Sequence, residues 1–317
     1  MFSLFEGTPI AQIDGKKNKI FVLNDEFSSE SSDTNQPIFN LGEVISSLNS
    51  GQKECPLCYK IFGSKDILRR HIGCSCPVGK TLQNKQTKIT NNKSRVFTIK
   101  TDVFGNSQII TNNKRSKLFP VVSDSNELGS SRDLYFVMGP SGVGKSTFLS
   151  KYIEQFMKKF PDRNIVLYSW IKDDPAFEGI LMNRIELNED IINNPLTLTQ
   201  LQNTLVIFDD ISGHDDISNM LHLLRDEILT KGRHNNIYSI STTHMISNWN
   251  ETRILKNESN KIVFFKNGPK KHIRNFLSSL GVTKNQIDNI LKLKSRWILI
   301  NQNFPMFVLW ENGAMIL

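Results

Sequence analysis

Eight consecutive residues follow the spacing G-x-x-x-x-G-K-[S/T], which suits a loop that wraps a phosphate chain. They are Gly139, Pro140, Ser141, Gly142, Val143, Gly144, Lys145 and Ser146. Glycines let the backbone N–H groups turn toward phosphate oxygens at the start of a helix. Lys145 would reach the β- and γ-phosphates of ATP, and Ser146 would place its hydroxyl on Mg²⁺. With Thr147, these residues form a predicted nucleotide-binding loop.

This spacing is informative only if a strand enters the loop and a helix leaves it. Residues 134–138 are apolar, with aromatic and β-branched types, and predict a buried parallel strand. Apolar residues then recur at helical spacing from Phe148 to Phe160, and Pro161 ends the pattern. Both flanking elements are therefore predicted, which disfavours a glycine-rich turn with a chance lysine.

Two neighbouring carboxylates provide the second chemical feature. Asp209 and Asp210 follow the apolar run 205–208, which predicts another buried strand. A buried strand that ends in acids can hold Mg²⁺ and orient water. Asp209 is the predicted magnesium ligand beside Ser146, and Asp210 would polarise the attacking water. The competing interpretation is that the acids only cap the next helix.

All four cysteines lie in one short stretch, which indicates a local site rather than a scattered disulfide framework. Cys55-x-x-Cys58 is followed after twelve residues by His71, and then by Cys74 and Cys76. This pattern resembles a C2H2-type zinc finger in its C2HC variant, with Cys55, Cys58, His71 and Cys76 as zinc ligands. The finger is predicted to be a small ββα unit. Cys76 is preferred to Cys74 because the four residues between it and His71 would let the helix present both ligands on one face, whereas only two separate Cys74 from His71.

The length and charge of the chain limit its possible domain organisation and its possible partners. The 317 residues can form one α/β domain and a smaller unit. No apolar run is long enough to cross a bilayer and no leader pattern is seen, so we expect a soluble, intracellular protein without a membrane partner. Fourteen Lys/Arg against three Asp/Glu between residues 51 and 118 give +11, whereas the whole chain carries +8. The basic stretch suggests a polyanion partner, and whether the finger binds DNA or protein stays open.

The organisation predicted from these features has four parts. Residues 96–99 and 108–111 are strand-like and flank Gly105-Asn106, which predicts a hairpin. The parts are a partly disordered N-terminal segment (1–50), the C2HC zinc finger (51–79), a basic linker that contains the hairpin (80–129) and an ATPase domain (130–317).

The domain after residue 130 is predicted to be α/β, with a mainly parallel sheet flanked by helices. A strand with polar residues at its tip, ending at His244, follows the acidic strand. This order resembles the additional-strand branch of P-loop ATPases, rather than small nucleoside kinases. Further strands are expected at 165–170, 262–265, 297–300 and 306–310, with helices at 217–228 and, after a capping box at Thr283, at 287–293.

Four motifs in order carry a more specific resemblance. They are G-P-S-G-x-G-K-S, the acidic F-D-D, G-R-H-N-N before a strand, and R-x-x-x-N before another strand. Over residues 130–312 this order is similar to the FtsK/HerA superfamily, and within it to the genome-packaging ATPases of nucleocytoplasmic large DNA viruses and virophages. The resemblance implies a ring-forming motor that hydrolyses ATP to drive double-stranded DNA into a preformed capsid. It also implies a host cytoplasm or viral factory setting, with association to the virion.

The resemblance further implies residue roles. His244 would sense the γ-phosphate at a position where the family usually has glutamine. Arg233 or Arg253 would supply positive charge to the site of a neighbouring subunit. The zinc finger lies outside the common core and would recruit DNA or dock onto capsid or packaging proteins. Two alternatives stay open: another FtsK/HerA-type pump for DNA transfer or segregation, and a nucleotide-gated zinc-finger DNA-binding protein without motor activity.

Overall fold

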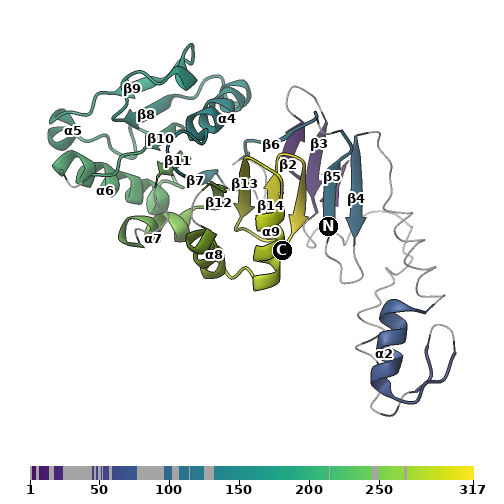
Figure 1. Cartoon of the computed structure of the whole chain (residues 1–317). Helices are drawn as coiled ribbons and strands as arrows, with labels where there is room; N and C mark the ends of the chain where they lie inside the picture. Colours follow the sequence, from purple (N-terminus) through teal and green to yellow (C-terminus); the bar gives the residue numbers. More distant parts are fainter. Residues whose placement is uncertain are drawn as a thin grey trace.

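The computed structural model contains two sheets, helices on the large sheet and a small helical unit near the N-terminus (Figure 1). It describes residues 2–4, 7–13, 18–23, 45, 48, 51, 53–56, 59–76, 96–101, 107–113, 115–124, 132–213, 215–244, 249–267 and 270–317. Cys58, most of the basic linker and the turn of the predicted hairpin lie outside these residues.

One half of the large sheet is parallel. Its strands lie in the order β12-β7-β11-β10-β8-β9, and every residue of β7, β8, β10 and β11 is buried. Apolar runs of this kind suit strands that are covered on both faces. Their bounds are β7 (Leu134–Met138), β8 (Ile165–Ser169), β9 (Asn183–Ile185), β10 (Leu205–Asp209), β11 (Tyr238–Thr243) and β12 (Lys261–Phe265).

The other half of the same sheet is antiparallel, so the prediction of a mainly parallel sheet is wrong for the sheet as a whole. The eleven strands are joined by five parallel and five antiparallel pairings. Short connections join β13 to β14 and β14 to β15, and such connections can join only antiparallel neighbours. The pairings of β12 with β13 and of β5 with β15 join segments that are farther apart in the chain. Its strands are β13 (Trp297–Asn301), β14 (Phe307–Trp310), β15 (Gly313–Ile316), β5 (Ser107–Thr111) and β4 (Phe97–Thr101).

A second, four-stranded sheet is formed in the order β1-β3-β2-β6. It shares a buried core with the large sheet and α4, because Phe119 of β6 packs against Phe148 and Trp297 with ring centroids 4.9 and 5.9 Å apart. Strands from both sides of residue 130 therefore share one core. The bounds are β1 (Phe2–Ser3), β2 (Thr8–Ile13), β3 (Lys19–Val22) and β6 (Leu118–Pro120).

Helices cover both faces of the large sheet. Tyr135 and Val137 of β7 pack in the same core cluster as α4, whereas Phe136 packs with α8 and α9. The capping box at Thr283 is confirmed. None of the described helices is long and apolar enough to span a membrane. The helices are α2 (Lys65–Cys74), α4 (Lys145–Lys159), 3-10 helix η2 (Pro175–Phe177), α5 (Asp190–Asn193), α6 (Asp216–Lys231), α7 (Trp249–Glu258), α8 (Lys270–Ser279) and α9 (Lys284–Lys292).

Candidate nucleotide site and candidate metal site

The phosphate-binding spacing forms the connection between β7 and α4. Gly144 is the N-cap of α4 and has φ of 103°, a left-handed conformation that strains any residue with a side chain. At Gly139 an added Cβ would lie only 3.0 Å from the Cβ of Phe265, at the end of β12. The two glycines therefore allow a tight turn whose helix begins with its N–H groups unpaired and available to an anion.

Lys145 is largely buried at the start of α4, with 8% of its surface exposed. Its Nζ donates to the carbonyl oxygens of Gly139 at 2.9 Å and Pro140 at 3.1 Å. Burial lowers the pKa of Lys145, and the negative charges of Asp210 and Asp209 oppose this shift. The ammonium group is thus held inside the loop, within the electrostatic reach of both acids.

Asp209 lies at the carboxyl end of β10 with both carboxylate oxygens held by hydroxyl groups. The Oγ1 of Thr242 donates to its Oδ1 at 2.8 Å, and the Oγ of Ser169 donates to its Oδ2 at 3.2 Å. These hydroxyls in turn accept from the N–H groups of Asp210 and Ile171. Because each hydroxyl accepts one hydrogen bond, its own proton points at Asp209. The carboxylate is therefore fixed in orientation by the two strands that flank β10.

Ser169 and Thr242 have functional positions that the sequence interpretation missed. Both are buried. Ser169 is the last residue of β8 and Thr242 is the penultimate residue of β11, and these two strands lie on either side of β10. A polar residue at the carboxyl end of an otherwise apolar parallel strand is the signal that would have found them. Which carboxylate they contact depends on strand order, which is non-local.

His244 joins Lys145 to Asp210. Its Nδ1 lies 3.0 Å from the Nζ of Lys145, and its Nε2 lies 2.6 Å from Oδ2 of Asp210. The ammonium can only donate, so Nδ1 must accept, and Nε2 then carries the proton that is donated to Asp210. Asp210 itself has a positive φ of 51°, so its backbone turns sharply after Asp209. The structure thus brings Lys145, Asp209, Asp210 and His244 together at one edge of the parallel sheet.

The other predicted site residues lie around or away from this cluster. Ser146 is partly exposed and Thr147 is exposed, both in the first turn of α4. Arg233 is exposed in the turn that precedes β11, at the opposite end of that strand from Thr242, and Arg253 is exposed on α7. Within the described residues no hydrogen bond or ion pair joins either arginine to the acidic pair of its own chain.

Asp209→Asn is expected to stabilise the fold in the absence of magnesium and nucleotide. Burial raises the pKa of Asp209 above its ordinary value of 3.8, although the hydrogen bonds from Thr242 and Ser169 oppose the shift. A carboxyl group whose folded pKa is raised loses stability as the pH rises through that range. The variant should therefore melt at a higher temperature than the unsubstituted protein at pH 8 with EDTA.

The difference in melting temperature between Asp209→Asn and the unsubstituted protein should be smaller at pH 4, where the carboxyl group of Asp209 takes up a proton. Thermal melts at the two pH values measure both differences. Asp216→Asn, an exposed carboxylate in the first turn of α6, is the matched control. A lower melting temperature for Asp209→Asn at pH 8 would contradict the role of burial.

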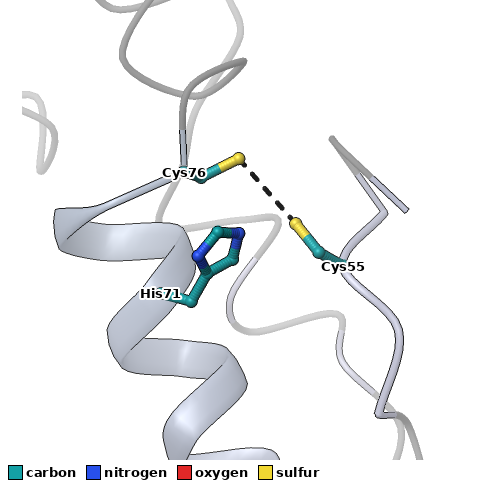
Figure 2. Close-up of side chains that lie close together, drawn as sticks. All are labelled: Cys55, His71 and Cys76. Carbon is teal, nitrogen blue, oxygen red and sulfur yellow. Dashed lines mark hydrogen bonds between the residues drawn. The ribbon is translucent and has the colours of Figure 1, made fainter. Parts of the chain in front are cut away.

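A second cluster brings three of the predicted zinc ligands together (Figure 2). The ligand atoms of Cys55, His71 and Cys76 all lie within 4.8 Å of one another, and the three residues are buried. The two sulfur atoms are 3.9 Å apart, which is not a disulfide distance. The Nδ1 of His71 lies 3.3 Å from Oγ of Ser75.

The backbone around this cluster has the predicted helix and a short β-bridge between Glu54 and Ile61. The expectation that one helix face presents both His71 and Cys76 is wrong, because α2 ends at Cys74. Instead, the N–H of Cys76 donates to the carbonyl of His71 at 2.7 Å, and this bond turns the chain back toward the helix. Cys58 lies outside the described residues.

Comparisons with known proteins find a matching domain family and a relative from a virophage. A family described as an AAA domain matches residues 131–264. Uncharacterized protein V3 of Sputnik virophage is 35% identical over 191 residues, which cover 59% of this chain and 78% of the relative.

Two solved structures are similar at low identity. The genome packaging NTPase B204 of Sulfolobus turreted icosahedral virus 2, in complex with sulfate, has a TM-score of 0.39 and 13% identity over 58% of this chain and 96% of its own. The pCW3 conjugation coupling protein TcpA has a TM-score of 0.40 and 11% identity, over 70% of this chain and 67% of its own. With the virophage relative covered over most of its length, the chain belongs to the family of virophage protein V3 and carries an AAA-type P-loop ATPase domain.

Proposed function

We propose that this protein is an ATP-driven motor that translocates double-stranded DNA and packages a viral genome into a capsid. The observation that carries the proposal is the cluster of Lys145, Asp209, Asp210 and His244 at the end of the phosphate-binding loop. The order of motifs that resembles the FtsK/HerA packaging ATPases supports it, as does membership of a virophage family.

The described residues suit ATP hydrolysis in the presence of Mg²⁺. The loop amides and Lys145 would bind the phosphates, while Ser146 and Asp209 would hold Mg²⁺, which neutralises phosphate charge when bound. The hydroxyls of Ser169 and Thr242 keep Asp209 oriented for that role. Asp210 would accept a proton from the attacking water. The loop would therefore bind and orient ATP, and the acidic pair would promote its hydrolysis.

His244 would report on the γ-phosphate. In the structure its Nδ1 accepts one of the hydrogen bonds of Lys145, and its Nε2 donates one to Asp210. When Lys145 turns to a phosphate oxygen, Nδ1 would lose its donor, and the imidazole would no longer be held between Lys145 and Asp210. Movement of the ring would then leave Oδ2 of Asp210 open to water. His244 would thus couple nucleotide entry to release of Asp210, the general base, through groups that are already in contact.

Substitutions at His244 separate this coupling from simple structural support. His244→Ala should lower kcat about 10- to 100-fold, because removal of one hydrogen-bonding group at a catalytic site costs about 1.5–3 kcal/mol. His244→Gln keeps an amide that can both donate and accept, so it should retain most of the activity. Steady-state hydrolysis measures both variants. Equal activity of all three proteins would contradict the role.

Arginine from a neighbouring subunit would complete the site. Arg233 and Arg253 are exposed and lie away from the acidic pair of their own chain, as a group that acts on a neighbour must. An arginine supplied in this way can contribute about 10³–10⁵ in rate. Hydrolysis would then depend on assembly of a homo-oligomeric ring.

We also propose that Cys55, Cys58, His71 and Cys76 bind zinc. Tetrahedral zinc with Zn–S bonds of about 2.3 Å places two sulfurs roughly 3.8 Å apart, close to the 3.9 Å between Cys55 and Cys76. Ser75 beside Nδ1 of His71 would leave Nε2 as the ligand nitrogen. The unit would recruit DNA or dock onto a capsid or packaging protein.

DNA-stimulated hydrolysis tests the proposed function. ATP hydrolysis by the zinc-loaded protein should rise when long double-stranded DNA is added, and the same DNA should have no effect on a Lys145→Ala variant. An equal rate of hydrolysis with and without DNA would argue for a different FtsK/HerA-type role. ATP binding without any hydrolysis would favour a nucleotide-gated DNA-binding protein.

A further inference from the structure

Exposed apolar side chains gather around β9, at one edge of the large sheet. After residue 130, six large apolar side chains of the described residues are exposed, and five of them lie between residues 170 and 223, which build this edge. Leu181, which precedes β9, is 83% exposed, and Ile171, which follows β8, is 50% exposed. The other three are Trp170 after β8, Ile192 on α5 and Leu223 on α6. Exposed apolar residues that gather in one region mark an interface with another protein.

The same edge has an open strand and a cavity. β9 is the last strand of the sheet, and no described strand pairs with its outer side. Beside it lies a cavity of about 400 Å³ that is open to solvent, lined by Ile185 from β9, Ile191 from α5 and Met220 from α6. Figure 1 shows β9 and α5 at one end of the molecule. This end therefore offers unpaired backbone groups and an apolar recess to the side chains of a partner.

The charge of this edge limits what can cover it. Residues 170–194, which we call the β9 surface, contain six Asp/Glu and two Lys/Arg, a net charge of −4. All of these acids except Asp174 are exposed. Such a surface repels a nucleic acid. It suits a protein surface rich in Lys and Arg, because their hydrocarbon stems pack on apolar residues while their charged groups meet carboxylates.

A surface of that kind lies on α8 and α9 of the same chain. Residues 266–296, which we call the α8–α9 surface, contain eight Lys/Arg and one Asp, a net charge of +7. The single acid, Asp288, lies 2.6 Å from Nη1 of Arg274 and offsets only that cation. Two surfaces of opposite charge are therefore present on one chain, and α8 and α9 lie apart from the β9 end of the molecule (Figure 1).

The fold brings the basic ends of the two helices together. α8 follows β12 and α9 precedes β13, and these strands are antiparallel neighbours. Nζ of Lys266 donates to the carbonyl of Leu293, which joins the segment before α8 to the segment after α9. Lys270 and Lys271 are exposed at the start of α8, and Lys294 is exposed just beyond the end of α9. These cations thus form one group instead of being spread along both helices.

Both surfaces reach the edge of the sheet that carries the candidate nucleotide site. The β9 surface begins directly after Ser169, which donates to Asp209. Burial raises the pKa of Asp209, and the negative charge of Asp174 adds to the shift. On the α8–α9 surface, Nη2 of Arg296 lies 3.1 Å from the point where a Cβ on Gly144 would be. A contact between the two surfaces would therefore lie next to the nucleotide sites of both copies.

We infer that the α8–α9 surface of one copy of this chain binds the β9 surface of the next copy. Because the two surfaces differ, the contact is heterologous, and its repetition by rotation closes a ring. The inference deepens the proposed function, since it rests on assembly of a homo-oligomeric ring and names the two surfaces that meet in it.

Charge reversal tests this contact. Lys270→Glu with Lys271→Glu reverses the α8–α9 surface, and Glu178→Lys with Glu186→Lys reverses the β9 surface; all four side chains are exposed. Each double variant should stay monomeric, with the Kd between copies raised about 100-fold or more, because like charges then face each other. The chain with all four substitutions should assemble again, with a Kd within about 10-fold of the unsubstituted value. Sedimentation velocity over a range of protein concentrations, with ATPγS and Mg²⁺, measures assembly.

Two further variants separate the contact from general effects of charge. Lys19→Glu with Lys158→Glu is the matched control, because both lysines are exposed outside the two surfaces, and it should assemble normally. Leu181→Asp removes an apolar contact and should raise the Kd about 10-fold or more. Ile67→Asp, at another exposed apolar side chain, should leave it unchanged. Thermal melts show whether each variant is folded.

Three outcomes would overturn the inference. The first is an unsubstituted protein that stays monomeric with ATPγS and Mg²⁺. The second is normal assembly of either double variant; if Lys270→Glu with Lys271→Glu then binds DNA more weakly, the α8–α9 surface contacts DNA instead. The third is a chain with all four substitutions that is folded but stays monomeric.

The assembly measurements need neither hydrolysis nor DNA. If the contact is right and the motor is wrong, the four substitutions restore assembly although DNA does not stimulate hydrolysis. If the motor is right and the contact is wrong, DNA stimulates hydrolysis in each double variant as it does in the unsubstituted protein.

Discussion

Asp210→Asn is expected to lower kcat for ATP hydrolysis by about 10²–10⁴-fold and to leave the Kd for ATP nearly unchanged. An amide cannot take up the proton of the attacking water, but its oxygen can still accept from Nε2 of His244, so the geometry of the site is kept. Steady-state hydrolysis and equilibrium binding of ATP measure the two quantities separately.

Asp216→Asn is the matched control for this substitution, because Asp216 is an exposed aspartate in the first turn of α6 and lies outside the cluster. It should leave both quantities unchanged. If Asp210→Asn had the kcat of the unsubstituted protein, Asp210 would have no role in hydrolysis. A loss that lies mainly in Kd would make it a binding residue instead.

Removal of zinc is expected to unfold the unit around Cys55, His71 and Cys76 and to spare the ATPase domain. Among the described residues of this unit the buried core is small: Leu48, Leu68 and Ile72 pack with Cys55 and Cys76. A core this small cannot offset the conformational entropy of folding, so bound metal must supply most of the free energy, on the order of 10 kcal/mol. Limited proteolysis with and without a chelator, followed by mass spectrometry, shows which segment becomes cleavable.

Two serine variants test the ligand assignment. Cys76→Ser should lose bound zinc, whereas Cys74→Ser should keep about one equivalent per chain. The zinc content of the purified proteins decides between them. If the two variants lose metal equally, or if the unsubstituted protein carries none, the assignment of the fourth ligand or of the whole site is wrong.

The parallel core was predictable because its signals are local. Runs such as 134–138 and 205–208 are apolar throughout, and α4 ends where Pro161 follows. The strand β9 is only three residues long and mostly exposed, so it carries no recognisable period. The pairing of β5 with β15 joins segments about 200 residues apart, and the sequence of neither strand indicates which strand it pairs with.

The residues of the candidate site also fall into two groups, those that local motifs predict and those whose contacts depend on the tertiary fold. The positions of Lys145, Asp209 and Asp210 follow from spacing within short motifs, which the chain must satisfy locally. The hydroxyl pair on Asp209 and the bridge made by His244 depend on which strands become neighbours. Arg296 beside Gly144 depends on the same tertiary arrangement and has no sequence signal of its own.

DNA translocation itself is the most direct measurement of the central claim. A short third strand is bound as a triplex at a defined distance along a long duplex, and its release is followed after ATP is added. The proposed motor should displace the strand only with ATP, after a lag that grows with distance, and Asp210→Asn should displace none. Sustained, DNA-stimulated hydrolysis without any displacement would contradict a translocating motor.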